Sequence, residues 1–168
     1  REQHAAKDAR PLIGLDAARA NRADIDWRAE DIPTPSFTGL RTLEDVPLAR
    51  IAAWSESAGL PREFPVASAH AIRKVLARTG LSIDDMAAIE VNEAFACVPL
   101  ICGQELGWDP GRVNRHGGSV AMGHPIGASG ARLVLTLAYQ LQETGGRYAI
   151  GAICSGTGQG DAILLEAV

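Results

Sequence analysis

Residues Asn114 to Arg132, NRHGGSVAMGHPIGASGAR, decide how the rest of the chain is arranged. In this stretch His124 stands between a glycine and a proline, further glycines surround it, and an apolar helix is predicted to follow at once. Glycine lets a backbone approach a ligand or another chain closely, and the start of a helix leaves free N–H groups. The stretch therefore predicts a site built largely from backbone.

Two other stretches are predicted to meet it. VNEAFA, from Val91 to Ala96, follows an apolar run, and ICSGTGQGDA, from Ile153 to Ala162, places Cys154 before a glycine-rich turn. Histidine, cysteine and asparagine on three loops at strand ends suit acyl chemistry, in which an anion must be stabilised by preorganised donors. We expect His124, Cys154, Gly156 and the Asn92 side chain to converge in one shallow pocket at the carboxyl ends of the strands.

Composition and charge limit the classes of function. The 168 residues are 46% apolar and 21% charged, with a net charge of −4, which argues against nucleic acid as a partner. No apolar run has the length of a membrane span, and the first residues are charged, so we expect a cytoplasmic protein. Cys97, Cys102 and Cys154 have no zinc-type spacing, so we expect reduced thiols and no metal.

Hydrophobic periodicity predicts an α/β domain over residues 48–168. The SGTGQG turn is too short for a crossover, so the last strand should be antiparallel in a mixed five-stranded sheet with helices on both faces. Helix 127–144 is apolar on two faces, and we expect the face with Leu133 and Leu137 to stay exposed. The predicted elements are strands at 48–54, 86–91, 113–122 (short or bulged), 147–154 and 161–168, and helices at 67–79, 95–106 and 127–144.

Residues 1–47 differ in character and are predicted to form an N-terminal extension or linker. They are charged and alanine-rich, then proline-rich, with a short helix expected around residues 14–21. PLIGLDAARANRADIDW followed by P-x-P-x-F-T-G resembles the connector before the activation domain of cobalamin-dependent methionine synthase. That resemblance covers about a quarter of the chain and contains no cobalamin ligand motif; a locally helical surface arm is the alternative.

The other motifs carry a second and more specific resemblance. VNEAFA, NRHGGSVAMGHPIGASGAR and CSGTGQGDA, in this order, resemble the C-terminal half of a thiolase, an enzyme that makes or cleaves 3-ketoacyl-CoA. The resemblance covers about residues 48–168. It implies a thiolase-like fold, an acyl-CoA substrate, and no cofactor other than the coenzyme A of that substrate.

The resemblance also implies roles for individual residues. His124 would help to hold a reactive cysteine as thiolate and donate to the thioester oxygen, and Cys154 would act as the acid and base. Asn92 would position a water in one oxyanion hole and Gly156 would lend a backbone N–H to the other. Each residue also has a structural alternative: a turn histidine for His124, a buried thiol for Cys154, an Asx turn for Asn92 and a hairpin glycine for Gly156. Gly118, Gly123 and Phe95 would contact substrate, Glu93 would tie loops together, and Cys97 and Cys102 would be core thiols.

A complete thiolase also has an N-terminal half, which carries the nucleophilic cysteine, and a loop domain that grips coenzyme A. Neither is recognised in these 168 residues, so we expect no activity from them alone. A partner supplying the missing half, or self-association, would cover the exposed apolar surface. The alternative is a non-catalytic interaction module. A ketoacyl synthase fits less well, because it would use two histidines, and G-x-G-x-G before a strand does not match a dinucleotide motif.

Overall fold

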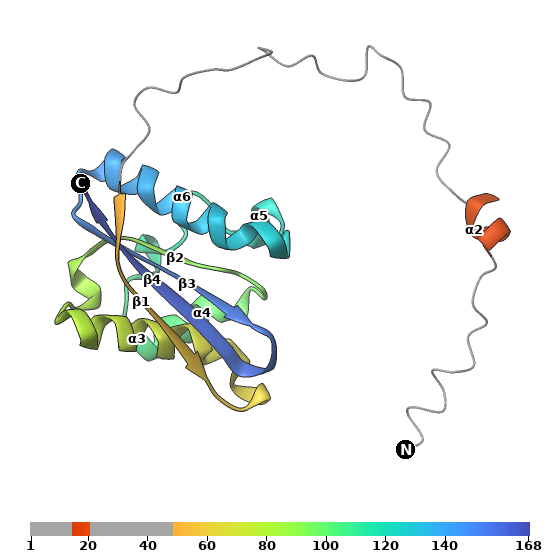
Figure 1. Ribbon diagram of the computed structural model, residues 1–168, viewed down its shortest axis with the longest axis horizontal. Coiled ribbons are helices and arrows are strands. Elements are labelled where there is room, and N and C mark those ends of the chain that lie inside the picture. Colours follow the sequence, from red (N-terminus) through yellow and green to blue (C-terminus); the bar gives the residue numbers. More distant parts are fainter. Residues whose placement is uncertain (1–14, 21–48) are drawn as a thin grey trace, which may run out of the picture. The chain divides into compact units, whose positions relative to one another are not determined.

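The computed structural model describes residues 15–20 and 49–168 (Figure 1). The chain divides into two compact units, Arg1–Thr42 and Leu43–Val168, and each is described by itself. Helix α2, Leu15–Ala20, lies in the first unit and agrees with the helix expected near residues 14–21. The remaining N-terminal predictions, including the methionine synthase connector, fall outside the described residues.

A mixed sheet of four strands forms the centre of the second unit, in the order β1-β4-β3-β2. Its parallel pair is β2 with β3, and β4 runs antiparallel to both β3 and β1. The α/β class and the antiparallel last strand are thus confirmed. The strands are β1, Ala49–Ala58; β2, Met86–Val91; β3, Tyr148–Ser155; and β4, Gln159–Ala167.

The prediction of a fifth strand within residues 113–122 is wrong. Only a single parallel bridge joins Val113 to Ile89, and the chain then turns away, because Asn114 adopts a left-handed backbone conformation (φ 49°). The Asn114 side chain replaces the strand ladder, since its Oδ1 accepts from the Val91 N–H and its Nδ2 donates to the Val91 carbonyl, both at 2.9 Å. A short helix, α5, Ser119–Met122, follows instead.

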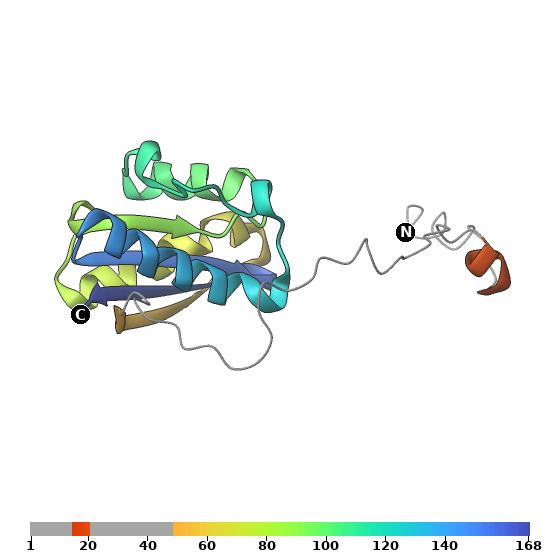
Figure 2. The same cartoon turned by 90° about the horizontal axis from the view of Figure 1, so that it is seen from above.

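Helices cover both faces of the sheet, as expected. Figure 1 shows α6, Ile126–Thr144, along one face and α3, Ala67–Thr79, along the other, and α4, Cys97–Leu106, packs on the α3 side. Figure 2 shows β1 at the edge of the sheet beyond the cover of α6. No helix among the described residues is both long and apolar enough to span a membrane. Short 3-10 turns complete the fold: η2, Pro61–Val66; η3, Ile83–Asp85; η4, Pro110–Arg112; and η5, Gly156–Gly158.

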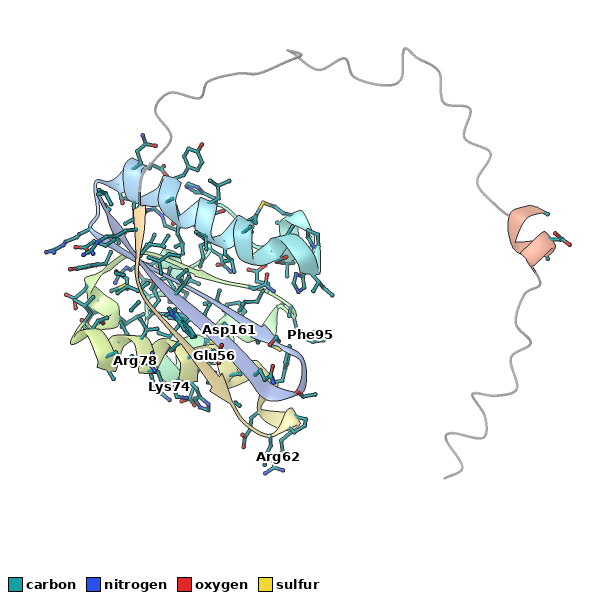
Figure 3. The ribbon with its side chains drawn as sticks, in the orientation of Figure 1. Glu56, Arg62, Lys74, Arg78, Phe95 and Asp161 are labelled. Atoms are coloured by element: carbon teal, nitrogen blue, oxygen red, sulfur yellow. The ribbon has the colours of Figure 1, made fainter. Side chains whose placement is uncertain are left out.

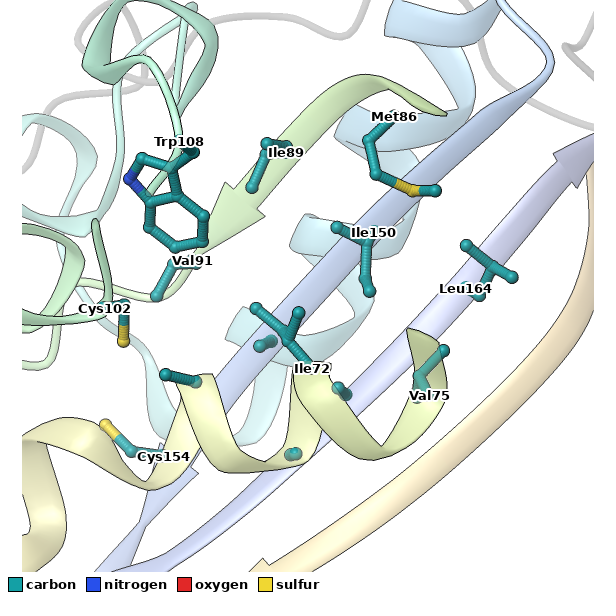
Figure 4. Close-up of a cluster of buried hydrophobic side chains, with 14 of the residues drawn as sticks. Ile72, Val75, Met86, Ile89, Val91, Cys102, Trp108, Ile150, Cys154 and Leu164 are labelled. Atoms are coloured by element: carbon teal, nitrogen blue, oxygen red, sulfur yellow. The ribbon is translucent and has the colours of Figure 1, made fainter. Parts of the chain in front are cut away.

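The larger core lies between the sheet and the α3–α4 layer (Figure 4). Ile72 and Val75 of α3 meet Ile150 of β3 and Leu164 of β4 there, all at most 1% exposed. A smaller core under α6 contains Leu137 and Leu141. Apolar burial of this extent is the main favourable term in folding.

The face of α6 that contacts the sheet is the opposite of the expected one. Leu133 and Leu137 are 3% and 0% exposed, whereas Leu135 and Tyr139 are 54% and 49% exposed. The buried stripe also contains Ser129 and Gln140, which made it look the more polar of the two faces. The Gln140 Nε2 donates to the buried Glu90 carboxylate at 2.8 Å, which offsets part of the cost of burying this amide, whereas its Oε1 has no partner.

Candidate active site

The parallel strands β2 and β3 bring Asn92 and Cys154 to one edge of the sheet. The Asn92 N–H donates to the Ala152 carbonyl at 2.9 Å, so Asn92 follows the end of β2 beside the last residues of β3. Parallel strands end at the same edge, where α/β proteins commonly bind ligands. The carboxyl edge is therefore where the predicted site residues gather.

The Asn92 and His124 side chains contact each other directly. Asn92 is fully buried, and its Nδ2 lies 3.3 Å from His124 Nε2. Its Oδ1 accepts from the buried Ser119 hydroxyl at 2.7 Å. Because Ser119 fixes the oxygen end of the amide, the nitrogen end must face His124.

A second serine determines the His124 tautomer. Ser129 Oγ donates to the Pro125 carbonyl at 3.1 Å and lies 2.7 Å from His124 Nδ1. A hydroxyl has one proton, so the Nδ1 atom must donate to Ser129, which leaves a lone pair on Nε2. That lone pair accepts from Asn92. Neutral His124 thus presents an acceptor toward the carboxyl edge.

Glu93 holds the glycine-rich loop in place, as expected for a residue that ties loops together. Its Oε1 accepts from Asn114 Nδ2 at 2.9 Å, and its Oε2 accepts from the Val120 N–H at 2.8 Å. Gly118 makes room for this carboxylate, because a Cβ at residue 118 would lie 2.4 Å from Glu93 Cδ. A structural requirement thus accompanies whatever contact Gly118 makes with substrate.

Cys154 lies one strand away from the Asn92–His124 pair and on the α3 side of the sheet. It is 5% exposed and belongs to the larger core, whereas Asn92 turns toward the start of α6. Burial raises the pKa of the Cys154 thiol. Gly156 lies in η5, with open space where its Cβ would be. The structure joins Asn92 to His124, and places Cys154 and Gly156 at the same edge without direct contact to that pair.

Phe95 and Gly123, which were predicted to contact substrate, lie on the loops that carry Asn92 and His124. Phe95, labelled in Figure 3, is 63% exposed. It makes an edge-to-face contact with Phe64, with ring centroids 5.8 Å apart. Gly123 has φ 90°, which disfavours any residue with a side chain. Exposed apolar side chains flank His124 in sequence: Val120, Met122 and Ile126. An apolar rim of this kind suits an acyl chain or another protein surface.

Sequence reasoning missed the two supporting serines. Nothing in the pattern distinguishes Ser119 and Ser129 from ordinary loop and helix serines, so only the fold reveals their roles. Cys102 is buried, as expected of a core thiol, but the same prediction for Cys97 is wrong because Cys97 is exposed at the start of α4. Within residues 15–20 and 49–168, no group of three or more His, Cys, Asp or Glu side chains could hold a metal.

Comparisons with known proteins agree on one family. The family model described as "Thiolase, C-terminal domain" matches residues 45–167. Mitochondrial acetyl-CoA acetyltransferase of Rattus norvegicus is 43% identical over 147 residues, which are 88% of this chain and 34% of that protein. This chain therefore spans about a third of the length of that relative.

Solved structures show the same fold at similar identity. The Bacillus anthracis acetyl-CoA acetyltransferase matches with a TM-score of 0.70 and 39% identity, over 73% of this chain and 31% of that one. A thiolase from Ascaris suum in complex with coenzyme A matches with a TM-score of 0.68 and 41% identity, over the same two shares. The chain belongs to the thiolase family, through its C-terminal domain.

Proposed function

We propose that this domain contributes one half of the active site of an acyl-CoA acyltransferase that forms or thiolytically cleaves 3-ketoacyl-CoA. The other half, joined to it or separate, would supply the nucleophilic cysteine. The observation that carries this proposal is the Asn92–His124 contact at the carboxyl edge, held by two buried serines. Coenzyme A would enter as part of the substrate, with no further cofactor.

The His124 tautomer suits the first step of such a reaction. As the Asn92 N–H releases the Nε2 lone pair, this lone pair takes the proton of the nucleophilic thiol, giving a thiolate and an imidazolium. The thiolate attacks the thioester carbonyl, and the new Nε2–H donates to the oxygen as its negative charge develops. The coenzyme A thiolate then leaves, and the acyl group stays on the nucleophile. Asn92, anchored by Ser119, would hold a water as a second donor.

Cys154 would move the other proton. Burial raises its pKa, so it is a thiol at neutral pH and can protonate the departing coenzyme A thiolate. The resulting Cys154 thiolate can then remove the α-proton of the second acyl-CoA, and the Gly156 N–H would stabilise the charge on that substrate's oxygen. The position of Cys154 next to the end of β3 supports this role.

The part of the sheet that α6 leaves uncovered, next to β1, is the place for the missing half. A groove of about 280 Å³ lies between α6 and the outer strands, lined by apolar side chains that include Trp54, Val134 and Ile163. Asp161 also lines the groove and lies directly across the strand pair from Glu56 (Figure 3). A docking half that offered an apolar helix and a cation would satisfy both features. The cytoplasmic location remains a prediction.

A chimera tests the proposal directly. Residues 45–167 would replace the corresponding domain of the Bacillus anthracis acetyl-CoA acetyltransferase, which has the same fold. We expect the chimera to cleave acetoacetyl-CoA in the presence of coenzyme A, and the 168-residue chain alone to show no turnover. His124→Ala and Cys154→Ala chimeras should each lose at least about a hundredfold in kcat, as expected for acid–base groups.

Ser82→Ala provides a matched control chimera, because Ser82 lies on the exposed turn before β2 and should leave turnover unchanged. A folded chimera that binds coenzyme A but turns over no substrate would contradict the catalytic proposal and favour a non-catalytic interaction module. Turnover by the isolated chain, abolished by Cys97→Ala, would show instead that this chain carries its own nucleophile.

A further inference from the structure

Ser68 is a fully buried residue whose hydroxyl has no hydrogen-bond partner. It is the second residue of α3 and is 0% exposed, and its Oγ atom forms no hydrogen bond to another atom of the described residues. Buried hydroxyl groups nearly always have a hydrogen-bond partner, because an unpaired one costs free energy. A role for this unpaired hydroxyl must therefore come from a group packed beside it.

Backbone packing places Ser68 over the end of β3. Gly160 of β4 lies so close to the start of α3 that a Cβ there would be 2.9 Å from Ser68 N and 2.5 Å from the Ala67 carbonyl. Gly160 is the direct cross-strand partner of Cys154. Cys154 in turn points into the core on the α3 side. Ser68 and Cys154 thus approach the same point from the helix and from the sheet.

The start of α3 is fixed in this position by a second serine. Ser57 of β1 is buried, and its hydroxyl donates to the Ala67 carbonyl at 2.8 Å. The positive end of a helix of 13 residues therefore remains directed at the end of β3. Among the described residues, the titratable groups that act on Cys154 from the neighbouring layer are the Cys97 and Cys102 thiols of α4.

We propose that Ser68 is a positioning residue for Cys154: the Ser68 hydroxyl turns to donate to the sulfur once the thiol has ionised and so stabilises the thiolate form. The catalytic consequence rests on the function proposed above, in which Cys154 cycles between thiol and thiolate; the contact itself does not. Ser68 keeps its own proton throughout, and the proton lost by Cys154 goes to the substrate or to solvent.

The electrostatic environment agrees with this assignment. Desolvation raises the pKa of Cys154, and the nearby Ser68 hydroxyl opposes that rise. Burial acts in the same direction on Cys102 of α4, whose pKa is raised to about 11. In Figure 4 the sulfur atoms of Cys102 and Cys154 point toward one another, so the two thiols share an environment in which a thiolate needs a donor.

A titration of the cysteines tests the contact without requiring turnover. The full chain would be labelled with 13C at the cysteine Cβ, and the Cys154 signal would be assigned by comparison with Cys97→Ser and Cys102→Ser chains. Ser68→Ala should move the Cys154 titration midpoint up by about one pH unit, the size expected for one hydrogen bond to a charged group. Ser68→Thr, which keeps the hydroxyl, should restore it.

Ser55→Ala is the matched control, because Ser55 is a buried serine that donates to the Ala71 carbonyl of the same helix. Ser55→Ala should lower stability and leave the Cys154 titration in place. The chains are compared over the rising part of the Cys154 chemical shift against pH, so the comparison does not require a pH at which the thiol is fully ionised. Equal titration in the wild-type and Ser68→Ala chains would overturn the proposal, as would an equal shift in Ser55→Ala.

The chimera separates this proposal from the catalytic one. If both hold, Ser68→Ala should move the basic limb of the kcat–pH profile by about the same interval as the titration midpoint. A shifted titration in a chimera without turnover would support the Ser68–Cys154 contact and contradict the catalytic function. Turnover with an unshifted titration would support the catalytic function and contradict the Ser68–Cys154 contact.

Discussion

At the scale of single residues, one carboxylate organises the loop that carries His124. Glu93 joins the end of β2 to Asn114 and to the start of α5, and Gly118 leaves the space that the carboxylate fills. His124 lies only six residues after Gly118 in the chain, so the loop conformation that Glu93 fixes also fixes the position of His124. The glycines of this loop are needed for packing as well as for access.

Gly118→Ala tests this role. The added methyl group would overlap the Glu93 carboxylate and break its bonds to Asn114 and Val120, so we expect a loss of about 2–4 kcal/mol in the free energy of unfolding. Gly127→Ala is the control, because a Cβ there meets nothing within 4 Å and alanine favours the helix by up to about 1 kcal/mol. Urea unfolding of both chains would measure this; an unchanged Gly118→Ala midpoint would contradict it.

Single residues were predictable from sequence where their motif is unusual. Asn92, His124 and Cys154 stand in stretches that combine rare residue types with glycines, and those stretches identified the edge of the sheet that carries them. Ser119 and Ser129 could not be found in this way, because their importance comes from partners 27 and 5 residues away in the chain. Hydrophobic periodicity contains no information about such pairs.

At the scale of elements, a buried ion pair connects β2 to α6. The Glu90 side chain is fully buried and accepts from Arg132 and from Gln140, each at 2.8 Å. Burial raises the pKa of Glu90, although both partners oppose that rise. Since Glu90 precedes Asn92 by two residues, and α6 begins just after His124, this pair holds together the two elements that carry the contacting side chains.

Arg132→Ala should therefore lower the free energy of unfolding by about 3–5 kcal/mol at neutral pH, because it leaves a buried carboxylate without its cation. The pKa of Glu90 lies above its unfolded value, so the folded chain binds the proton more readily. Stability from this group is complete below the ordinary carboxyl pKa and is lost as the pH rises through the folded pKa. The loss caused by Arg132→Ala should thus be smaller near pH 4 than near pH 7.

Arg73→Ala gives the comparison for an exposed pair. Arg73 and Glu105 are both about half exposed, so removing the arginine should cost less than about 1 kcal/mol at either pH. Denaturant unfolding at the two pH values would measure both chains. A loss in Arg132→Ala that does not change with pH would show that the Glu90 carboxyl is not the group responsible.

Buried polar contacts such as that of Glu90 explain why the orientation of the elements could not be predicted from the sequence. The predicted span of α6, residues 127–144, was nearly right, but its buried face was not, because Gln140 and Ser129 look like solvent-facing residues until their partners are known. The fifth strand failed for a similar reason, since the Asn114 amide imitates strand pairing with Val91. Periodicity locates elements well, whereas paired polar groups decide their orientation.

At the scale of the whole described domain, the sheet is covered unevenly. The face beside α6 leaves Ile51 and Trp54 of β1 60% exposed, and Leu135 of α6 is 54% exposed. Grooves lined largely by apolar groups lie on this α6–β1 face, where Gly130 and Val134 line both. A surface of this kind is expected to be covered by another protein surface.

In the absence of a second half, this face should drive self-association. Fully burying side chains of this type contributes roughly 1.5–3 kcal/mol each, so a few of them suffice for association at tens of micromolar. Leu135→Lys should release folded monomers, because Leu135 is already exposed, whereas Leu137→Lys should unfold the domain, because Leu137 is fully buried.

Leu100→Lys is the matched control for position, since Leu100 is 65% exposed but lies on α4, on the other side of the sheet. Sedimentation velocity would compare the four chains at equal concentration. We expect Leu100→Lys to associate like the wild-type chain and Leu135→Lys to sediment as a monomer. If the wild-type chain is already monomeric at tens of micromolar, the α6–β1 face is covered within the chain itself, and the second half of a thiolase would have to displace that cover before it could dock.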